Sequence, residues 1–457
     1  MDHTDVLILC TLKSGLSICY NYDEILKADM TVLHPVESNL SKRLLSILTT
    51  ERARLLRSVA EEATHRELPL YIVGGFVRDL ILDHPVQDFD LVVEGEAIGL
   101  AQGVAAKLGG RVICHNRFKS AQWFPLGSDR TPEFVDFMTA RSETYKHPAA
   151  LPTVRPGKLK DDLRRRDFTI NTLAVRLDGM HFGELHDELG GLEDLHAGLI
   201  RVIHPASFTD DPTRLFRLVR YEQRYGFQIV PGTLALVGKS RSQIKRLSAE
   251  RVRHELDLIL DEENAAPMLK RLAELRILES VHPALKWTQA SQGRFANGFA
   301  AAKKLKHPPN SRSLGWALWL MDSPFPVLES IDKRLHFDSA LRKHLLAASA
   351  ILAKINALVN KKPSRWVAFL DAFPLKAVQA AWLALPFGQA QEGLHAYLET
   401  WRQIKPRTSG HDLKERGQQP GPGYQSILGG LRDAWLDGKV KTNAEEMVLL
   451  EKLIKKQ

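Results

Sequence analysis

The sequence predicts an α+β protein in which a small mixed-sheet domain precedes a long all-helical half. In the first part, short apolar segments alternate with helical patterns and then follow one another directly, as in a mixed sheet. Beyond residue 205 nearly every segment carries apolar residues at helical spacing. The 457 residues are too many for one core and predict about two to four domains.

The composition is that of an ordinary globular protein with a basic balance. Hydrophobic residues make up 44% and charged residues 26%, and no apolar run approaches the roughly 20 residues that span a bilayer. The formal net charge of +9 favours a polyanionic partner. Cys10, Cys19 and Cys114 form no CxxC pair, which argues against a disulfide framework or a zinc site and favours a reducing, cytoplasmic compartment.

The first 40 residues are expected to be a leader. No basic segment precedes the apolar residues 6–10, so no signal peptide is predicted. Met30 offers an alternative start, which would make residues 1–29 a mis-called extension. A loosely attached leader is the other reading, and both stay open.

The predicted elements follow from the apolar spacing. A helical lead-in covers residues 41–66, and the following elements are strand 69–74, helix 76–82, strand 89–93, helix 96–108 and strands near 111–115, 120–126 and 133–138. The proline-rich segment from about residue 140 to 160 is predicted to be a loop able to move over a site. Helices are predicted at 211–225, 248–262, 265–276, 296–304, 313–321, 340–357, 364–371, 376–383, 388–403, 424–436 and 443–455, with a break around 405–422.

The most informative stretch is residues 71–93, which read YIVGGFVRDLILDHPVQDFDLVV. Two glycines before a helix offer backbone N–H groups to a phosphate. Strand alternation puts Asp88 and Asp90 on one face, where two carboxylates favour a divalent metal between them. Each feature alone is common in turns and strand ends. Together, with Arg78 and Asp79 in the helix, they indicate a nucleotidyl-transfer site.

A second motif is DDLRRRDFTINTLA at residues 161–174. Arg165, Arg166 and Asp167 are predicted to project from the start of a helix that buries its apolar side. An arginine there can hold a triphosphate or a ribose hydroxyl, and a solvated basic face is the plainer alternative.

A third motif is DDPTRLFRLVRYEQRYG at residues 210–226. Asp210 or Asp211 suits an N-cap and Pro212 the first helical turn. Helical spacing places four arginines within an arc of about 120°; they are Arg214, Arg217, Arg220 and Arg224. An exposed basic face is an even alternative, but the few acids on this helix favour bound phosphate or base edges.

Taken together, these motifs resemble the class II tRNA nucleotidyltransferases (CCA-adding enzymes) and the bacterial poly(A) polymerases. GGFVRD with QDFDLVV is similar to the family's first motif, DLRRRDFTIN to its second, and HDELGGLEDLHAGLIRVI at 186–203 to its linking motif. DDPTRLFRLVRY is similar to the nucleotide-selecting motif, with Asp210 where Glu is common, and LSAERVRHEL at 247–256 to the helix that braces it. The resemblance covers residues 69–262 in order and returns at 410–440.

The resemblance implies a polymerase-β-like organisation. A nucleotidyltransferase head would span 41–175, and a neck with the nucleotide-selecting helix would span 176–265. An RNA-binding helical body at 266–405 and a helical tail at 406–457 would follow.

It also implies a division of chemical roles. Asp88 and Asp90 would hold two Mg²⁺ ions, and Gly75, Arg78 and Arg166 would contact the triphosphate. Asp136 is a candidate third carboxylate, although a strand-end aspartate is as often solvated.

Base selection follows from donor and acceptor patterns. Asp211 would accept a proton from the exocyclic amine while Arg214 donates to the ring nitrogen, a pattern that cytosine and adenine share. Arg217 and Arg220 would continue toward phosphate or brace Asp211. The implied partners are the tRNA acceptor end, CTP and ATP, with no membrane. The sequence carries no signal for an oligomeric state.

Three activities share these motifs: full CCA addition, partial CC or A addition, and poly(A) synthesis. The presence of residues 139–160 between the first two motifs favours full CCA addition. A catalytically silent RNA-binding module is disfavoured because the paired aspartates and the Asp211/Arg214 pair are all present. His411 and Asp412 are interpreted as structural residues of a loop, without metal chemistry.

Overall fold

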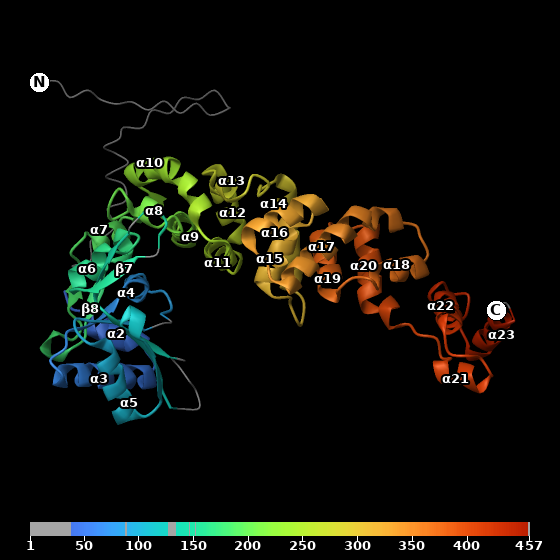
Figure 1. The fold of residues 1–457 in the computed structure, drawn as a ribbon, viewed down its shortest axis with the longest axis horizontal. Helices are drawn as coiled ribbons and strands as arrows, with labels where there is room; N and C mark the ends of the chain where they lie inside the picture. Colours follow the sequence, from blue (N-terminus) through green and yellow to red (C-terminus); the bar gives the residue numbers. More distant parts are fainter. Residues whose placement is uncertain (1–37, 87–88, 127–133, 146, 151, 456–457) are drawn as a thin grey trace, which may run out of the picture. The chain divides into compact units, whose positions relative to one another are not determined.

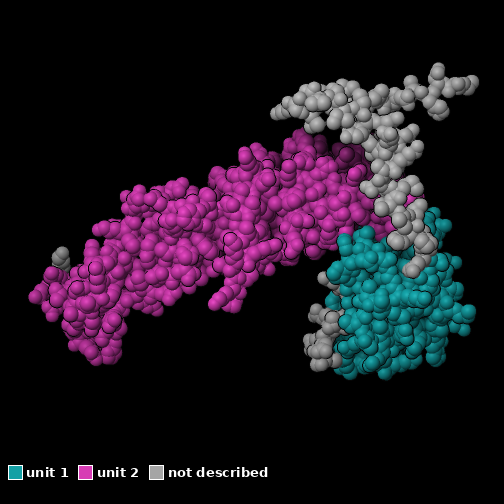
Figure 2. All heavy atoms as spheres, turned by 180° about the vertical axis from the view of Figure 1, so that it is seen from behind, with its two compact units in different colours: residues 1–142, 155–166, 171–191 teal, residues 143–154, 167–170, 192–457 magenta. Residues whose placement is uncertain are grey.

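The structure is a computed structural model that describes residues 38–86, 89–126, 134–145, 147–150 and 152–455. The chain forms two compact units, coloured separately in Figure 2. The head unit consists of residues 1–142, 155–166 and 171–191, and the helical unit consists of residues 143–154, 167–170 and 192–457.

The head unit contains a seven-stranded mixed sheet. Its strands, in spatial order, are β3 (Arg111–His115), β4 (Ser120–Phe124), β5 (Val135–Thr139), β2 (Asp90–Val93), β1 (Leu70–Val73), β8 (Ala174–Arg176) and β9 (Leu185–His186). The pair β2–β5 is parallel and the other neighbours are antiparallel. All residues of β1 are buried, as expected for a central strand covered on both faces. The predicted mixed-sheet fold is therefore confirmed.

Helices cover this sheet. The head helices are α2 (Ser41–Ile47), α3 (Thr50–His65), α4 (Gly75–Ile81), α5 (Ala97–Leu108) and α6 (Leu159–Arg164). Helix α5 packs on β4 and β5, and α3 packs on α5 (Figure 1). The Thr49 side chain caps α3, and Gly109 ends α5 with a positive φ of 75°, a conformation that favours glycine.

The segment predicted as a loop contains regular structure. Strands β6 (Arg141–Thr144) and β7 (Thr153–Pro156) form a separate two-stranded sheet. The prediction of an irregular loop was wrong because the prolines avoid the strand positions whose N–H must pair with the neighbouring strand. Pro156 ends β7, and Pro148 lies in the connection, so the β-branched residues between them are free to pair.

The helical unit confirms the predicted all-α half. Its helices are α7 (Gly191–His196), α8 (Ser207–Asp210), α9 (Arg214–Tyr225), α10 (Pro231–Ser240), α11 (Ala249–Leu260), α12 (Ala265–Glu274), α13 (Ile277–Val281), α14 (Gln289–Ala302), α15 (Ser311–Leu320), α16 (Phe325–Leu335), α17 (Ser339–Lys354), α18 (Pro363–Leu370), α19 (Leu375–Ala384), α20 (Gln389–Glu399), α21 (Gly410–Glu415), α22 (Pro422–Leu436) and α23 (Asn443–Ile454). The only strands wholly inside this unit in the described chain are the two-residue pair β10 (Leu199–Ile200) and β11 (Gln228–Ile229).

Six of these helices, α7, α8, α10, α13, α16 and α21, escaped prediction, and α7 and α8 are only six and four residues long. Helix α10 contains two glycines, α13 has five residues, and α16 begins at a Pro-Phe-Pro segment, so the apolar spacing is short or interrupted in each. Helix α21 lies in the predicted break and is nucleated by a capping box between Ser409 and Asp412. Within the described chain no single helix could cross a membrane, although the bent pair α18 and α19 has the required length and composition taken together.

The tail is fastened by a buried carboxylate. Glu446 of α23 is fully buried and accepts hydrogen bonds from the backbone N–H groups of Arg407 (3.0 Å) and Thr408 (2.7 Å). It also accepts from the Thr408 hydroxyl and the Trp435 indole N–H. Burial acts to raise the pKa of Glu446, but these donors outweigh it and hold the pKa below its ordinary value.

We expect Glu446→Gln to destabilise the tail by about 3 kcal/mol, because its amide N–H₂ would face buried donors. The stabilisation from the ionised carboxylate should be complete above the ordinary carboxyl pKa and disappear as pH falls through the lowered pKa. Limited proteolysis between residues 405 and 457, repeated at decreasing pH from 7 downward, measures both effects. The exposed Glu451→Gln is the control; equal cleavage of the two variants would contradict this account.

Candidate active site

The carboxylates of the head lie at one end of the parallel strand pair. Asp90 begins β2 and lies directly opposite Asp136 of β5. Both side chains are half-buried, and residues paired in register project from the same face. Two adjacent carboxylates supply hard oxygen ligands, the set that suits Mg²⁺. The residues present therefore fit a divalent metal. Asp88 lies outside the described residues.

A glycine turn follows β1 and leads into α4. Gly74 has a φ of 70°, and a Cβ atom there would lie 2.2 Å from Nη1 of Arg166. A Cβ on Gly75 would lie 3.4 Å from Nη2 of Arg78. The positive φ and the short distance at Gly74 favour glycine, whereas the distance at Gly75 is an ordinary van der Waals contact. The head thus brings together Gly75, Arg78 and Arg166, while their contact with a triphosphate stays a prediction.

Arg78 is almost fully buried, and three hydrogen bonds hold its guanidinium group in place. Its Nε and Nη2 donate to the two carboxylate oxygens of Asp79, both at 2.9 Å, and Nη1 donates to Oδ1 of Asn171 at 2.6 Å. A guanidinium group fixed in this way needs no reordering when an anion binds. Asn171 was not singled out from the sequence.

Arg166 is oriented by Asp162, which has no exposed surface. Asp162 accepts from Nη2 of Arg165 at 2.7 Å and from Nη2 of Arg166 at 3.0 Å. Burial acts to raise the pKa of Asp162, but the charges of Arg166 and Arg165 outweigh it and lower the pKa. The carboxylate is therefore ionised and holds both arginines. The spacing of three and four residues from Asp162, which is typical of neighbours on a helix, was the available sequence signal.

The predicted position of these arginines on a helix was wrong. Helix α6 ends at Arg164, so Arg165, Arg166 and Asp167 follow its end and do not project from the start of a helix. The chain then forms the 3-10 helix η2 (Thr169–Asn171), which buries the neighbouring apolar residues.

The helical unit carries the predicted base-selecting pair. Oδ1 of Asp211 accepts from the backbone N–H (3.1 Å) and hydroxyl (2.7 Å) of Thr213 and from Nη2 of Arg251 (2.7 Å). Arg214 is buried and donates from Nη1 to the Ser207 hydroxyl at 2.6 Å. Helix α9 starts at Arg214, later than predicted. Asp211 precedes this helix and closes the turn around Pro212 by accepting from the Thr213 N–H.

Arg251 and Ser207 were missed by sequence reasoning. Arg251 lies on α11, within the segment LSAERVRHEL that resembles the bracing motif. Its ion pair with Asp211 shows how that helix holds the pair. No signal in the sequence marked Ser207.

The arginines lower on α9 are paired with acids. Nη2 of Arg217 lies 2.8 Å from Oδ2 of Asp167, Nη1 of Arg220 lies 3.1 Å from Oε2 of Glu255, and Arg224 pairs with Glu262. Asp167 raises the pKa of Arg217. The expectation of few nearby acids was wrong because these acids come from other segments. The ion pairs brace α9; a contact of Arg217 or Arg220 with nucleotide stays a prediction.

Part of the β6–β7 connection lies beside the base-selecting pair. The Tyr145 hydroxyl donates to Oε2 of Glu143 at 2.9 Å, and Ala149 N–H donates to the Thr209 carbonyl at 3.3 Å. Burial raises the pKa of Tyr145, with Glu143 adding to the effect and Arg214 opposing it. The segment predicted to move over a site therefore contacts α8, which immediately precedes Asp211.

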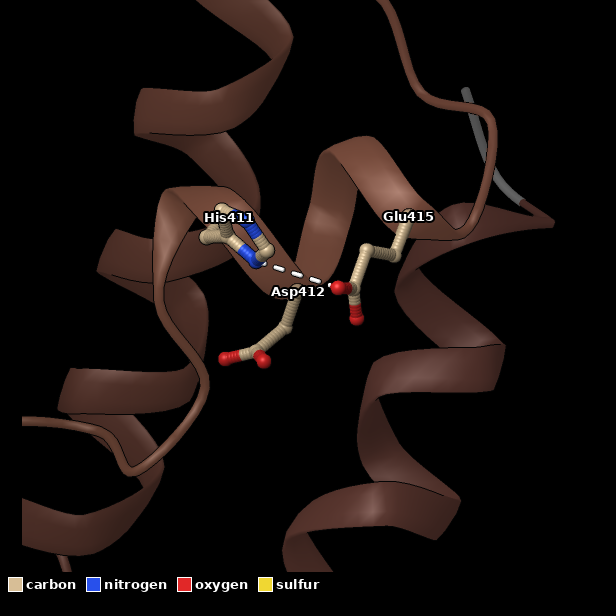
Figure 3. A group of neighbouring side chains, drawn as sticks. All are labelled: His411, Asp412 and Glu415. Carbon is tan, nitrogen blue, oxygen red and sulfur yellow. Dashed lines mark ion pairs between the residues drawn. The ribbon is translucent and has the colours of Figure 1, made fainter.

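The tail contains a group of side chains close enough to share an ion. Among the described residues it is the one such group, and it consists of His411, Asp412 and Glu415 (Figure 3). His411 and Glu415 form an exposed pair with 3.3 Å between Nδ1 and Oε1. Asp412 accepts from the N–H and hydroxyl of Ser409 as part of the capping box. These residues lie on α21 and not in the predicted loop. Asp412 serves helix capping, and the structural interpretation of His411 stays a prediction.

Comparison with known proteins gives matches over most of the chain. The family described as poly A polymerase head domain matches residues 70–201, and the probable RNA and SrmB-binding site of polymerase A matches residues 226–288. The A-adding tRNA nucleotidyltransferase of Halalkalibacterium halodurans is 31% identical over 85% of this chain and 90% of its own length. The chain spans 47% and 27% of the A-adding enzymes of Geobacter sulfurreducens and Aquifex aeolicus.

Two other matches define the range of activities among relatives. The CC-adding tRNA nucleotidyltransferase of Geobacter sulfurreducens is 32% identical over 51% of this chain and 49% of its own length. The structure of the Thermotoga maritima CCA-adding enzyme complexed with tRNA has a TM-score of 0.75 at 26% identity and covers 92% of this chain and 98% of that one.

The head and its matches define the protein as a nucleotidyltransferase. The chain belongs to the family of tRNA nucleotidyltransferases and bacterial poly(A) polymerases, so the resemblance in its motifs is confirmed.

We expect Asp162→Asn to weaken binding of ATP and CTP alike by about tenfold, because Arg166 would lose a charged hydrogen bond that holds it over Gly74. Fluorescence titration with non-reactive analogues of ATP and CTP measures this affinity. Asp161→Asn is the control, since this exposed residue accepts from the Lys158 N–H and an amide oxygen can do the same. Unchanged affinity in Asp162→Asn would exclude this role.

Proposed function

We propose that this enzyme adds nucleotides to the 3′ end of tRNA and that the terminal AMP is the addition for which it is built. The observation that carries the proposal is the extent of similarity along the chain. Two A-adding relatives align over 85% and 87% of it, whereas CC-adding and multifunctional CCA relatives align over about half. The resemblance thus includes the helical body and not only the shared head.

Full CCA addition, which the sequence analysis favours, is the second candidate. It is supported by solved CCA-adding enzymes that cover 92% of this chain and by the connection between the first two motifs. Complexes of such enzymes with ATP and with CTP are consistent with a pair such as Asp211 and Arg214 that accepts either base.

The head would perform the transfer for either nucleotide. Asp90, with Asp88 and Asp136, would hold Mg²⁺, which when bound lowers the pKa of the attacking 3′-hydroxyl and neutralises the leaving pyrophosphate. Gly75 would offer its backbone N–H to the triphosphate, and Arg78 and Arg166 would neutralise its charge from two sides.

The pair on the helical unit would select the base. Arg251 and Thr213 fix Oδ1 of Asp211, which leaves Oδ2 to accept from the exocyclic amine. Arg214, held by Ser207, would donate to the ring nitrogen. Uracil and guanine present a carbonyl where the amine should be, which costs on the order of 1–3 kcal/mol for each mismatched buried group.

The test is extension of two tRNA substrates, one ending in CC and one lacking all three nucleotides, with CTP alone, ATP alone and both. We expect one A on the first substrate and no extension of the second. Full CCA on the second would establish the second candidate. An A tract would indicate poly(A) synthesis, and no product with any combination would refute nucleotide addition to tRNA.

We expect Asp211→Ala to lower the discrimination of ATP over GTP by about tenfold or more, because the amine-accepting group is lost. Arg251→Met should act in the same direction with a smaller effect, since Asp211 keeps its bonds to Thr213. Ratios of kcat/KM for the four nucleotides measure it, with the exposed Arg246→Met as control. An equal loss for all four nucleotides would rule out the selecting role.

A further inference from the structure

Arg52 of α3 lies against the chain that enters β2. Its Nη1 donates to the Val86 carbonyl at 3.1 Å, and its guanidinium carbon lies 4.7 Å from the centre of the Phe89 ring. Phe89 is buried and stacks on Phe76 of α4 with 5.5 Å between ring centres. One side chain therefore contacts the connection between α4 and β2 and the residue that immediately precedes Asp90.

The other end of the same connection is held by a second arginine. Nη2 of Arg43, on α2, donates to the Ile81 carbonyl at 2.9 Å and lies 2.7 Å from Oδ1 of Asp83. Asp83 has a φ of 56°, so the chain turns sharply after α4. Arg43 thus secures the exit from the phosphate-facing helix, whereas Arg52 secures the entry to the carboxylate strand.

Neither arginine belongs to the motifs that resemble the family. Both come from the helical lead-in before the first motif, which sequence reasoning used only for its apolar spacing. The contacts of Arg52 restrict the positions of the Val86 carbonyl and the Phe89 ring. A charged hydrogen bond to a carbonyl is directional, and a guanidinium over an aromatic face restricts the ring at the same time.

We infer that Arg52 is a positioning residue for the metal-binding carboxylates, acting on Asp90 through Val86 and Phe89. This inference rests on the proposed role of Asp90 in holding a divalent metal. Metal affinity depends on how well the ligand oxygens are held before the ion arrives, and loss of a group that orients a ligand typically weakens binding by about tenfold or more.

The experiment measures metal binding without turnover. Free Mn²⁺ is followed by electron paramagnetic resonance during titration of the full-length enzyme without nucleotide, because a free triphosphate would itself chelate the ion. Arg52→Met keeps an apolar stem and loses the charge and the hydrogen bond, so the half-saturating Mn²⁺ concentration should rise about tenfold. Arg52→Lys keeps the charge without the planar fork, so a smaller rise is expected.

Two matched arginines serve as controls. Arg54 is exposed on the same helix, and Arg54→Met should leave the Mn²⁺ titration unchanged. Arg43→Met should lower the midpoint of thermal unfolding without moving the Mn²⁺ titration, because Arg43 holds the end of the connection remote from Asp90. An unchanged Mn²⁺ titration in Arg52→Met, or an equal shift in Arg43→Met, would overturn the inference.

A second variant covers the case in which Arg52→Met does not fold. Phe89→Leu keeps a buried apolar side chain and removes the ring face on which Arg52 lies. It should shift the Mn²⁺ titration in the same direction, and combining it with Arg52→Lys should give less than the sum of the two effects. Additive effects would contradict a shared action on Asp90. Because the titration requires no tRNA, failure of the proposed tRNA activity would leave this comparison intact.

Discussion

The parallel pairing of β2 with β5 is the constraint on which the head depends. It places Asp90 beside Asp136 at strand ends, where strands lie about 5 Å apart. Two ionised carboxylates at this distance repel by about 3 kcal/mol at an effective dielectric constant of 20. A parallel pair also requires a crossover, which α5, β3 and β4 supply, and α5 covers the sheet as a result. A divalent cation bound between the two carboxylates, as proposed, would offset this repulsion.

Both halves of the chain prepare arginines in the same way. Asp79 and Asn171 fix Arg78, Asp162 fixes Arg166, and within the helical unit Ser207 fixes Arg214. Each arginine has lost its rotamer freedom during folding, so this cost would not be repeated on the proposed binding of nucleotide. Asp162, which holds Arg166, is fully buried, and an ion pair with a buried carboxylate is costly to break. The fixed positions of these arginines therefore come at a cost in folding stability.

The sequence predicted the elements around the first motif within one or two residues because glycines, charges and short apolar runs bound each strand there. It predicted Gly75, Arg78 and Arg166 as one group, and the structure places them together. It could not predict the groups that orient them. Asn171 is 93 residues from Arg78, Arg251 is 40 from Asp211, and Arg52 is 34 from Val86. Such partners are set by tertiary packing, which local periodicity does not encode.

The fixed positions of Asp211 and Arg214, the proposed base-selecting pair, limit which bases the pair could distinguish. Three donors hold Oδ1 of Asp211 and a hydroxyl holds Arg214, so the pair presents one acceptor and one donor in fixed positions. Cytosine and adenine satisfy that pattern equally. If Asp211 and Arg214 act as proposed, discrimination between these two bases would come from base size or from the position of the RNA end. The groups near this pair include Tyr145, which follows β6 and donates a hydrogen bond to Glu143 of that strand.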